Sequence, residues 1–176
     1  MIYINKKHKF YKILSISDNF IDAPIPIAWK LILTSDGSFT QNLTSISNQL
    51  IHVKIEEQYK QIHIKQTSIL RRIWLEDKSH NKLTFAQSLW YINKYSNSYL
   101  SDTVPIGQLF LQSGIDIYKN IEEIYCGYSA YLQHYFKSSD LIWGRRYKIY
   151  YKKQILAIIQ EFFPSHLIKY ANITFK

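Results

Sequence analysis

The chain has 176 residues, 47% of them hydrophobic, which excludes an intrinsically disordered protein and fits one domain spanning residues 1–176. The formal net charge is +9, which favours anionic partners but does not distinguish nucleic acid, acidic lipid and small carboxylates. Cys126 is the single cysteine, so an internal disulfide is excluded. No run reaches the ~20 apolar residues of a membrane-spanning helix, and we expect no membrane partner.

Residues 1–24 show no clear periodicity. Their first part lacks the continuous apolar core of a secretory signal and the Arg- and Ser-rich composition of an imported leader, so we expect the protein to work where it is made. Ile, Lys, Asn, Tyr and Phe are abundant, whereas Gly, Ala and Pro are scarce. This bias is typical of an AT-rich genome, either that of an organelle or that of an AT-rich bacterium, and it supplies part of the positive charge.

Two short helices are predicted next, over residues 25–33 and about 39–48. Pro26 is tolerated in the first turn of the first helix, and Asp36, followed by glycine, signals a turn. Ser38, with a glutamine three residues later, has the spacing of a capping box at the start of the second helix. The two helices should form a hairpin.

The pattern then changes to that of strands. Residues 50–66 alternate apolar and polar positions, as a half-buried strand does, and two more β-like runs follow at 68–77 and 82–92. The polar residues between these runs suit a hairpin loop. A further short helix is predicted at 105–113, opened by a proline and closed by Gly114.

The C-terminal part of the chain continues mainly in strands. The first half of residues 115–137 is interpreted as a strand, and the second half is left open. Residues 142–154 and 155–164 form the last strong pair, with a tight turn near Lys152-Lys153. Consecutive strands joined by hairpins, with helices early and in the middle, indicate an α+β fold with helices packed on an antiparallel sheet.

Strand alternation predicts which charged groups are buried. From residue 143 the even positions carry most of the cations and should face water, which places Arg145 on the apolar face; these even positions are Gly144, Arg146, Lys148, Tyr150 and Lys152. The strand at 155–164 is apolar on both faces, so Glu161 needs a partner or a ligand. One arginine of the pair Arg71-Arg72 must also point toward the core.

These buried charges allow two interpretations. The first is a structural ion pair between an arginine and Glu161, and the second is a site that binds an anion. Buried ion pairs do not reliably stabilise a fold, which favours a functional site slightly. The residues by themselves leave both interpretations open.

Several segments resemble one known family. The segment WGRRYKIYYKKQILAIIQEFFP is similar, without gaps, to the C-terminal signature of the chorismate lyases (chorismate pyruvate-lyases). LRRIWL resembles the family's Leu-Arg-x-hydrophobic segment, VPIGQLF its Pro-hydrophobic-Gly helix start, and LTSDGSFTQNL its N-terminal helix hairpin. These segments cover most of the chain from Trp29 to Pro164 in the family's order, and they most resemble its plastid-encoded branch.

The resemblance implies an antiparallel sheet with helical flaps over a buried ligand pocket. It also implies a carbon–oxygen lyase that converts chorismate to 4-hydroxybenzoate and pyruvate by eliminating the enolpyruvyl group, without a metal or an organic cofactor. Arg71 matches the family arginine that binds the ring carboxylate, and Glu161 matches the acid near the ring hydroxyl. These two are the expected catalytic residues.

The remaining substrate-binding residues follow from the same resemblance. Ile106 matches a position that contacts the ligand through its backbone, and a second backbone contact falls near Asp36. Arg145, if it points inward, could bind the pyruvyl carboxylate. The chain departs from typical bacterial lyases at Gln87, where they have an arginine, and this removes one candidate carboxylate ligand.

Other functions are weighed against this one. The same fold occurs as the effector-sensing domain of some transcription regulators, so a non-catalytic binding domain for a small aromatic carboxylate is the main alternative, although residues 1–24 are too few for a helix-turn-helix. The basic aromatic run YKIYYKK could bind nucleic acid, but a solvated strand face is favoured. The six histidines show no ligand spacing, so we expect no metal site.

The partner expected from these considerations is a small-molecule dicarboxylate, with no nucleic acid and no membrane. A monomer is the default expectation. We expect the protein in the plastid stroma, with the cytoplasm of an AT-rich bacterium as the alternative compartment.

Overall fold

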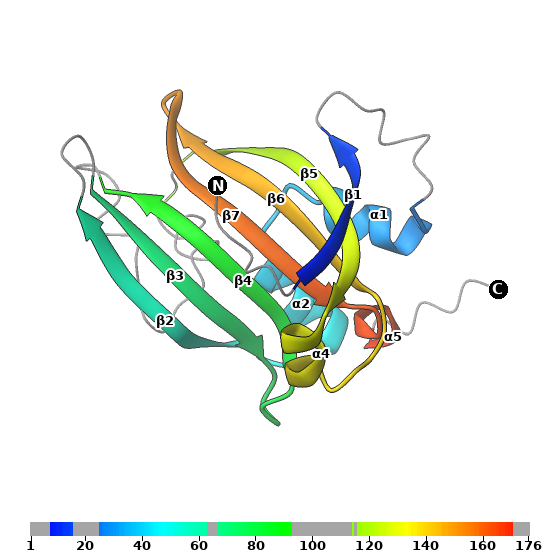
Figure 1. The fold of residues 1–176 in the computed structure, drawn as a ribbon. Coiled ribbons are helices and arrows are strands. Elements are labelled where there is room, and N and C mark those ends of the chain that lie inside the picture. Colours follow the sequence, from blue (N-terminus) through cyan, green and yellow to red (C-terminus); the bar gives the residue numbers. More distant parts are fainter. Residues whose placement is uncertain (1–7, 16–24, 63–66, 93–113, 115, 171–176) are drawn as a thin grey trace.

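The computed structural model describes residues 8–15, 25–62, 67–92, 114 and 116–170, which form a seven-stranded antiparallel sheet with helices packed on it (Figure 1). Across the sheet the strands follow the order β1-β5-β6-β7-β4-β3-β2. The strands are β1 (His8–Ser15), β2 (His52–Ile62), β3 (Thr67–Glu76), β4 (Lys82–Tyr91), β5 (Tyr118–Ser129), β6 (Ile142–Tyr151) and β7 (Gln154–Pro164). The described helices are α1 (Ile27–Thr34), α2 (Phe39–Ser47), α4 (Ala130–Phe136) and α5 (Leu167–Tyr170). The predicted α+β class is confirmed.

Local turn chemistry explains the hairpin of β3 and β4. Oδ1 of Asp77 accepts hydrogen bonds from the backbone N–H groups of Ser79 and Asn81, at 2.8 and 2.9 Å. His80 adopts a positive φ of 61°. An aspartate that bonds the backbone ahead of it is a common way to close a turn, so the predicted loop follows from its own residues.

The hairpin of β6 and β7 turns at Lys152 and Lys153, as predicted. Both residues have positive φ, 47° and 64°, which is the backbone of a turn that matches the twist of the flanking strands. The turn sets the register of the pair and places Arg145 opposite Glu161. Residues opposite one another in an antiparallel pair point to the same face, so these two side chains meet.

The segment left open in the sequence is helix α4. Oγ of Ser129 accepts a hydrogen bond from the backbone N–H of Leu132 at 3.1 Å and caps the start of the helix. Lys137 ends it with a φ of 53°. The bulge-containing strand β5 runs directly into this cap, so the sequence shows no break between strand and helix.

The predicted helical hairpin is α1 and α2. Ser38 lies at the N-cap of α2 as expected, but its side chain makes no capping hydrogen bond, so the predicted capping box is wrong in its chemistry. Asn48 ends the helix in the left-handed region. The helix predicted at 105–113 lies outside the described residues.

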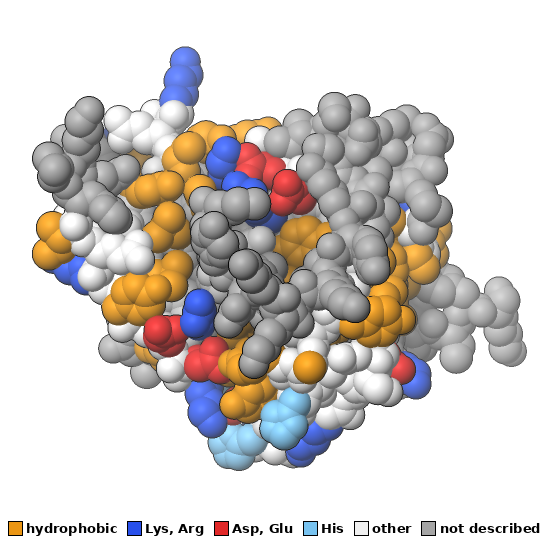
Figure 2. All heavy atoms as spheres, in the orientation of Figure 1, with side chains coloured by type: hydrophobic (Ala, Val, Ile, Leu, Met, Phe, Trp, Pro, Cys, Tyr) orange, Lys and Arg blue, Asp and Glu red, His pale blue; other side chains and the backbone are white. Residues whose placement is uncertain are grey.

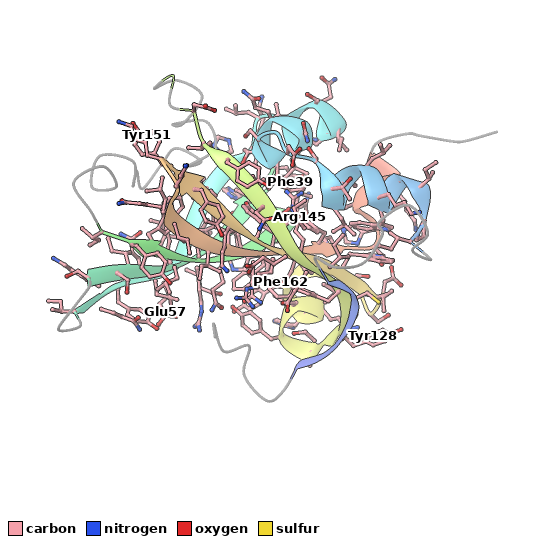
Figure 3. All side chains as sticks on the ribbon, turned by 90° about the horizontal axis from the view of Figure 1, so that it is seen from above. Phe39, Glu57, Tyr128, Arg145, Tyr151 and Phe162 are labelled. Carbon is pink, nitrogen blue, oxygen red and sulfur yellow. The ribbon has the colours of Figure 1, made fainter. Side chains whose placement is uncertain are left out.

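The sheet has two covered faces. On the inner face, α1 and α2 pack through a core that includes Trp29, whose ring stacks on Trp143 at 5.4 Å between centroids. Figure 3 shows Phe39 and Arg145 on this side of the sheet and Glu57 and Phe162 on the other. On the outer face, α4 covers an aromatic cluster in which Trp74 and Phe85 lie 4.8 Å apart.

Of the even positions predicted to face water, Lys152 is exposed, whereas those within β6 are wholly or partly covered. Gly144 is buried on the outer face under the ring of Tyr125, and a Cβ atom at this position would collide with that ring. Arg146 and Lys148 are half-buried, and both pair with Glu122 of β5. The outer face is covered because the aromatic cluster under α4 extends across the sheet, which the alternation of a single strand cannot reveal.

Candidate functional site

Three predicted charged residues lie on the inner face of the sheet. Arg71, Arg145 and Glu161 expose 1%, 0% and 7% of their surface. Arg71 lies opposite Ser88 of β4, and Ser88 lies opposite Ile159 of β7, two residues before Glu161. The register therefore places Arg71 and Glu161 on the same face, two strands apart.

The neighbouring arginine points the other way. Arg72 lies on the outer face, where Nη1 pairs with Glu57 at 2.5 Å and Nε donates to Oε1 of Gln87 at 3.3 Å. Arg71 is therefore the arginine of the pair that points toward the core. Gln87 lies with Arg72 on the outer face, so its replacement of an arginine does not remove a group from the inner face.

Arg145 and Glu161 form a buried ion pair, with Nε of Arg145 2.7 Å from Oε2 of Glu161. Nη1 of Arg145 donates to the carbonyl oxygens at the end of α1, those of Ile32, Leu33 and Ser35, at 2.9 to 3.2 Å. A cation at the C-terminal end of a helix compensates carbonyl groups that have no partner within the helix. Arg145 thus joins the centre of the sheet to the helical hairpin.

Glu161 is held at both oxygens. Its Oε1 accepts a hydrogen bond from the hydroxyl of Tyr147 at 2.9 Å. Burial, followed by the charge of Glu161, raises the pKa of Tyr147 well above its ordinary value, so this hydroxyl remains a donor. The carboxylate is therefore fixed in position on the inner face.

Lys119 of β5 is a charged residue of this cluster that the sequence did not reveal. Its Nζ donates to the carbonyl of Ser35 at 2.9 Å and lies 4.3 Å from the centre of the Tyr147 ring. Burial, and secondarily the charge of Arg145, lower its pKa from 10.5 to about 8, while Glu161 and Asp36 act in the opposite direction. Ile117 and Ile121 lie two residues before and after Lys119, so strand alternation would have placed this lysine on the apolar face.

The other predicted site residues lie at the edge of the cluster or outside the described chain. Asp36 is exposed in the turn between α1 and α2, where its charge reaches Lys119. Ile106 lies outside the described residues. Two hollows lined by described residues lie elsewhere, one of about 260 Å³ against α1 and α2 and one of about 500 Å³ near the turn of β6 and β7.

Within the described ranges, no helix is both long and apolar enough to cross a membrane. In the same part of the chain, no group of three or more His, Cys, Asp or Glu side chains is arranged to hold a metal ion.

The fold resembles that of solved bacterial proteins. A possible transcriptional regulator, YydK from Bacillus subtilis, superposes with a TM-score of 0.56 at 10% identity, over 69% of this chain and 60% of that chain. The gene product SA0254 from Staphylococcus aureus gives a TM-score of 0.51 at 12% identity, over 74% of this chain and 89% of that chain. At such low identity this likeness shows the fold alone.

Sequence comparison identifies the family. Residues 33–171 match the family described as chorismate pyruvate-lyase Rv2949c-like. Uncharacterised proteins named ycf21 are similar along most of the chain: that of Antithamnion sp. is 40% identical over 83% of each chain, and that of Porphyra purpurea is 37% identical over 81% of this chain and 84% of the relative. The resemblance predicted from the sequence is confirmed, and this chain belongs to the Rv2949c-like chorismate pyruvate-lyase family.

Proposed function

We propose that this protein converts chorismate to 4-hydroxybenzoate and pyruvate. The observation that carries the proposal is the shared inner face of Arg71 and Glu161, both buried and each at the position that matches a functional residue of the family. The same face also holds Arg145 and Lys119. Within the described residues the buried cations of this cluster outnumber its buried carboxylate, which favours an anionic ligand.

Each group has a role that suits its chemistry. The planar guanidinium of Arg71 can bind the ring carboxylate with two parallel hydrogen bonds. Glu161, fixed by Arg145 and Tyr147, can accept a hydrogen bond from the 4-hydroxyl and assist removal of the proton from the same ring carbon. Asp36 and Ile106 stay proposed contacts from the family resemblance.

The reaction needs no second substrate. The ring loses a proton from the carbon that bears the hydroxyl, the neighbouring carbon–oxygen bond breaks, and its electron pair leaves with the enolpyruvyl oxygen. The ring becomes aromatic, and the released enol takes up a proton at its methylene carbon to give pyruvate. Because aromatisation supplies driving force, the protein has mainly to orient the substrate and polarise the leaving group.

A turnover assay with variants of two adjacent arginines tests the proposal. With chorismate, the purified protein should form 4-hydroxybenzoate, followed by absorbance, and pyruvate, followed with lactate dehydrogenase, in equal amounts. Arg71→Gln should lower kcat/KM by about 100-fold or more, because a charged hydrogen bond to the substrate is lost. Arg72→Gln makes the same substitution on the outer face and should leave the rate nearly unchanged. A folded protein that forms neither product would reject the proposal.

The alternative is a domain that binds a small aromatic carboxylate without turning it over. Calorimetry with 4-hydroxybenzoate separates the two functions, because binding with a Kd in the micromolar range and no product from chorismate would support the alternative. The charges of the outer face give little support to a nucleic-acid function. Arg146 and Lys148 pair there with Glu122 and Glu123, and Figure 2 shows acidic and basic side chains beside one another on this face.

The compartment that we propose is the plastid stroma. The ycf21 name shared by the algal relatives and the composition of an AT-rich genome support a plastid-encoded protein. We further propose that the chain acts as a monomer on a small-molecule dicarboxylate, without metal or organic cofactor. Sedimentation of the purified protein, and its activity after treatment with a chelator, would test these two points.

A further inference from the structure

We propose that Lys119 binds the second carboxylate of the substrate, the one on its enolpyruvyl side chain. The inference rests on the proposed function, because it assigns a further residue of the same site. It concerns a group that stands within the inner-face cluster but belongs to none of the matched family positions.

Two of the three side-chain nitrogens of Arg145 are already engaged by the protein. Its Nε bonds Glu161, and its Nη1 bonds three carbonyl groups of the chain around the end of α1. The guanidinium carbon also lies 5.3 to 5.8 Å from the centres of the rings of Phe39, Tyr147 and Phe163. These contacts hold the helical hairpin on the sheet, so Nε and Nη1 act mainly in positioning. Nη2 is buried and has no hydrogen-bond partner among the described residues, so this group can assist Lys119 but has no room to replace the contacts of Nε and Nη1.

Lys119 is a cation with remaining donors. An ammonium group has three N–H donors, and among the described residues Nζ gives one hydrogen bond, to the carbonyl of Ser35. Its other close contact is the face of the Tyr147 ring. Lys119 can therefore keep the hydrogen bond to Ser35 and still donate to a carboxylate.

The position of Lys119 suits the shape of the substrate. Tyr147 contacts Lys119 through the face of its ring and Glu161 through its hydroxyl, so the lysine and the carboxylate both lie beside this one side chain. In chorismate the 4-hydroxyl and the enolpyruvyl ether are on neighbouring ring carbons. With the 4-hydroxyl at Glu161, the side chain of the substrate can extend along Tyr147 toward Lys119.

The charged form of Lys119 is energetically unfavourable at this position. Burial and the nearby charge of Arg145 disfavour its ammonium form, which is why its pKa falls to about 8. A dianionic ligand would compensate this charge. A cation held at a cost to stability beside a proposed active site is a candidate for binding rather than for folding.

A matched pair of ligands tests the inference without turnover. The dianion is 3-(1-carboxyvinyloxy)benzoate, which is already aromatic and cannot eliminate. The monoanion is the same molecule with a methyl group in place of the side-chain carboxylate. We expect the wild-type protein to bind the dianion about 10- to 100-fold more tightly, because the second carboxylate adds a charged hydrogen bond.

The variants are Lys119→Met, Lys119→Arg and, as the matched control, Lys148→Met on the outer face of β6. Lys119→Met should abolish the preference for the dianion and leave the monoanion affinity within about twofold. Lys119→Arg should restore much of the preference, and Lys148→Met should keep it. Circular dichroism confirms that each variant is folded.

The outcomes separate this inference from the proposed function. A preference that persists in Lys119→Met, or an equal loss for both ligands, would overturn the role of Lys119 while leaving an anion site at Arg71. Wild-type protein that binds neither ligand would overturn both. Loss of the preference in Lys148→Met as well would show a general effect of charge and would also overturn the inference.

Discussion

Arg145 and Glu161 lie directly opposite one another on β6 and β7, and their side chains form an ion pair of 2.7 Å. The same arginine donates to carbonyl groups at the end of α1, 110 to 113 residues earlier in the chain. One side chain thus connects the proposed catalytic carboxylate with the helical hairpin. The structural ion pair that the sequence left open is confirmed, and the anion site that we propose shares Glu161 with it.

Removal of the Arg145 charge should destabilise the protein strongly. Arg145→Met leaves the buried carboxylate of Glu161 without its cation, and we expect the free energy of unfolding to fall by about 3–5 kcal/mol in urea titrations at pH 7. Arg146→Met, on the outer face of the same strand, should cost about 1 kcal/mol or less, because Arg146 is half-buried and its pairs are longer. Equal losses would contradict the assigned role of Arg145.

The hydroxyl of Tyr147 should matter for turnover more than for folding. Tyr147→Phe frees Oε1 of Glu161, and we expect kcat to fall about 10- to 100-fold while stability falls by about 1 kcal/mol. Tyr125→Phe is the matched control, since Tyr125 is equally buried and its hydroxyl donates to the backbone carbonyl of Arg145 at 3.1 Å. It should lose similar stability and keep its kcat. A similar fall in the kcat of Tyr125→Phe would mean that the hydroxyl of Tyr147 acts only through stability.

The lowered pKa of Lys119 predicts how stability changes with pH. In the unfolded chain this lysine binds its proton up to about pH 10.5, whereas in the folded protein it releases it near pH 8. The unfolded state therefore binds more protons between these values, so the contribution of Lys119 to stability rises with pH there. Between pH 7 and pH 9 the free energy of unfolding should increase by about 1 kcal/mol relative to Lys119→Met.

This comparison isolates Lys119 from its charged neighbours. The groups that face it are Arg145 and Tyr147 of β6, Glu161 of β7 and Asp36 of the turn after α1, and all of them remain in the variant. Urea titrations of both proteins at the two pH values provide the measurement. Parallel behaviour of the two proteins would show that Lys119 keeps an ordinary pKa.

Deprotonation of Lys119 should also weaken the binding of the dianionic ligand. Because only the ammonium form can bind a carboxylate, the affinity for 3-(1-carboxyvinyloxy)benzoate should be constant below about pH 8 and fall up to tenfold per pH unit above it. Lys119→Met should bind weakly with no such dependence. Calorimetry from pH 7 to 9 provides the measurement, and a flat profile in the wild-type protein would speak against Lys119 as the ligand.

Gly144 should tolerate no side chain. Its Cβ position lies against the ring of Tyr125 and 3.0 Å from the backbone carbonyl oxygen of Glu161. We expect Gly144→Ala to lower stability by about 1–3 kcal/mol and also to reduce turnover, because it pushes on the strand that carries Glu161. Tyr125→Leu should recover part of the stability in the double variant. Full recovery would mean that the contact with β7 is unimportant.

Part of the site could be predicted from residues close together in the sequence. Alternation along β6 placed Arg145 inward, and the apolar run of β7 showed that Glu161 needs a partner, since a buried carboxylate is costly. The family motifs located Arg71. These inferences hold because the period of a strand is a local property, and because the β6–β7 hairpin sets its own register through a short turn.

The sequence by itself determined the class of fold, the family and the burial of Arg145 and Glu161, because periodicity, turn chemistry and the cost of burying charge act over a few residues. Only the tertiary structure decided that Arg145 donates hydrogen bonds to the carbonyl groups at the end of α1. It also decided that Arg72 and Gln87 face away from the proposed site and that Lys119 faces into it. Such choices depend on which strands become neighbours and on bulges such as that after Ile121, which reverse the face of every later residue.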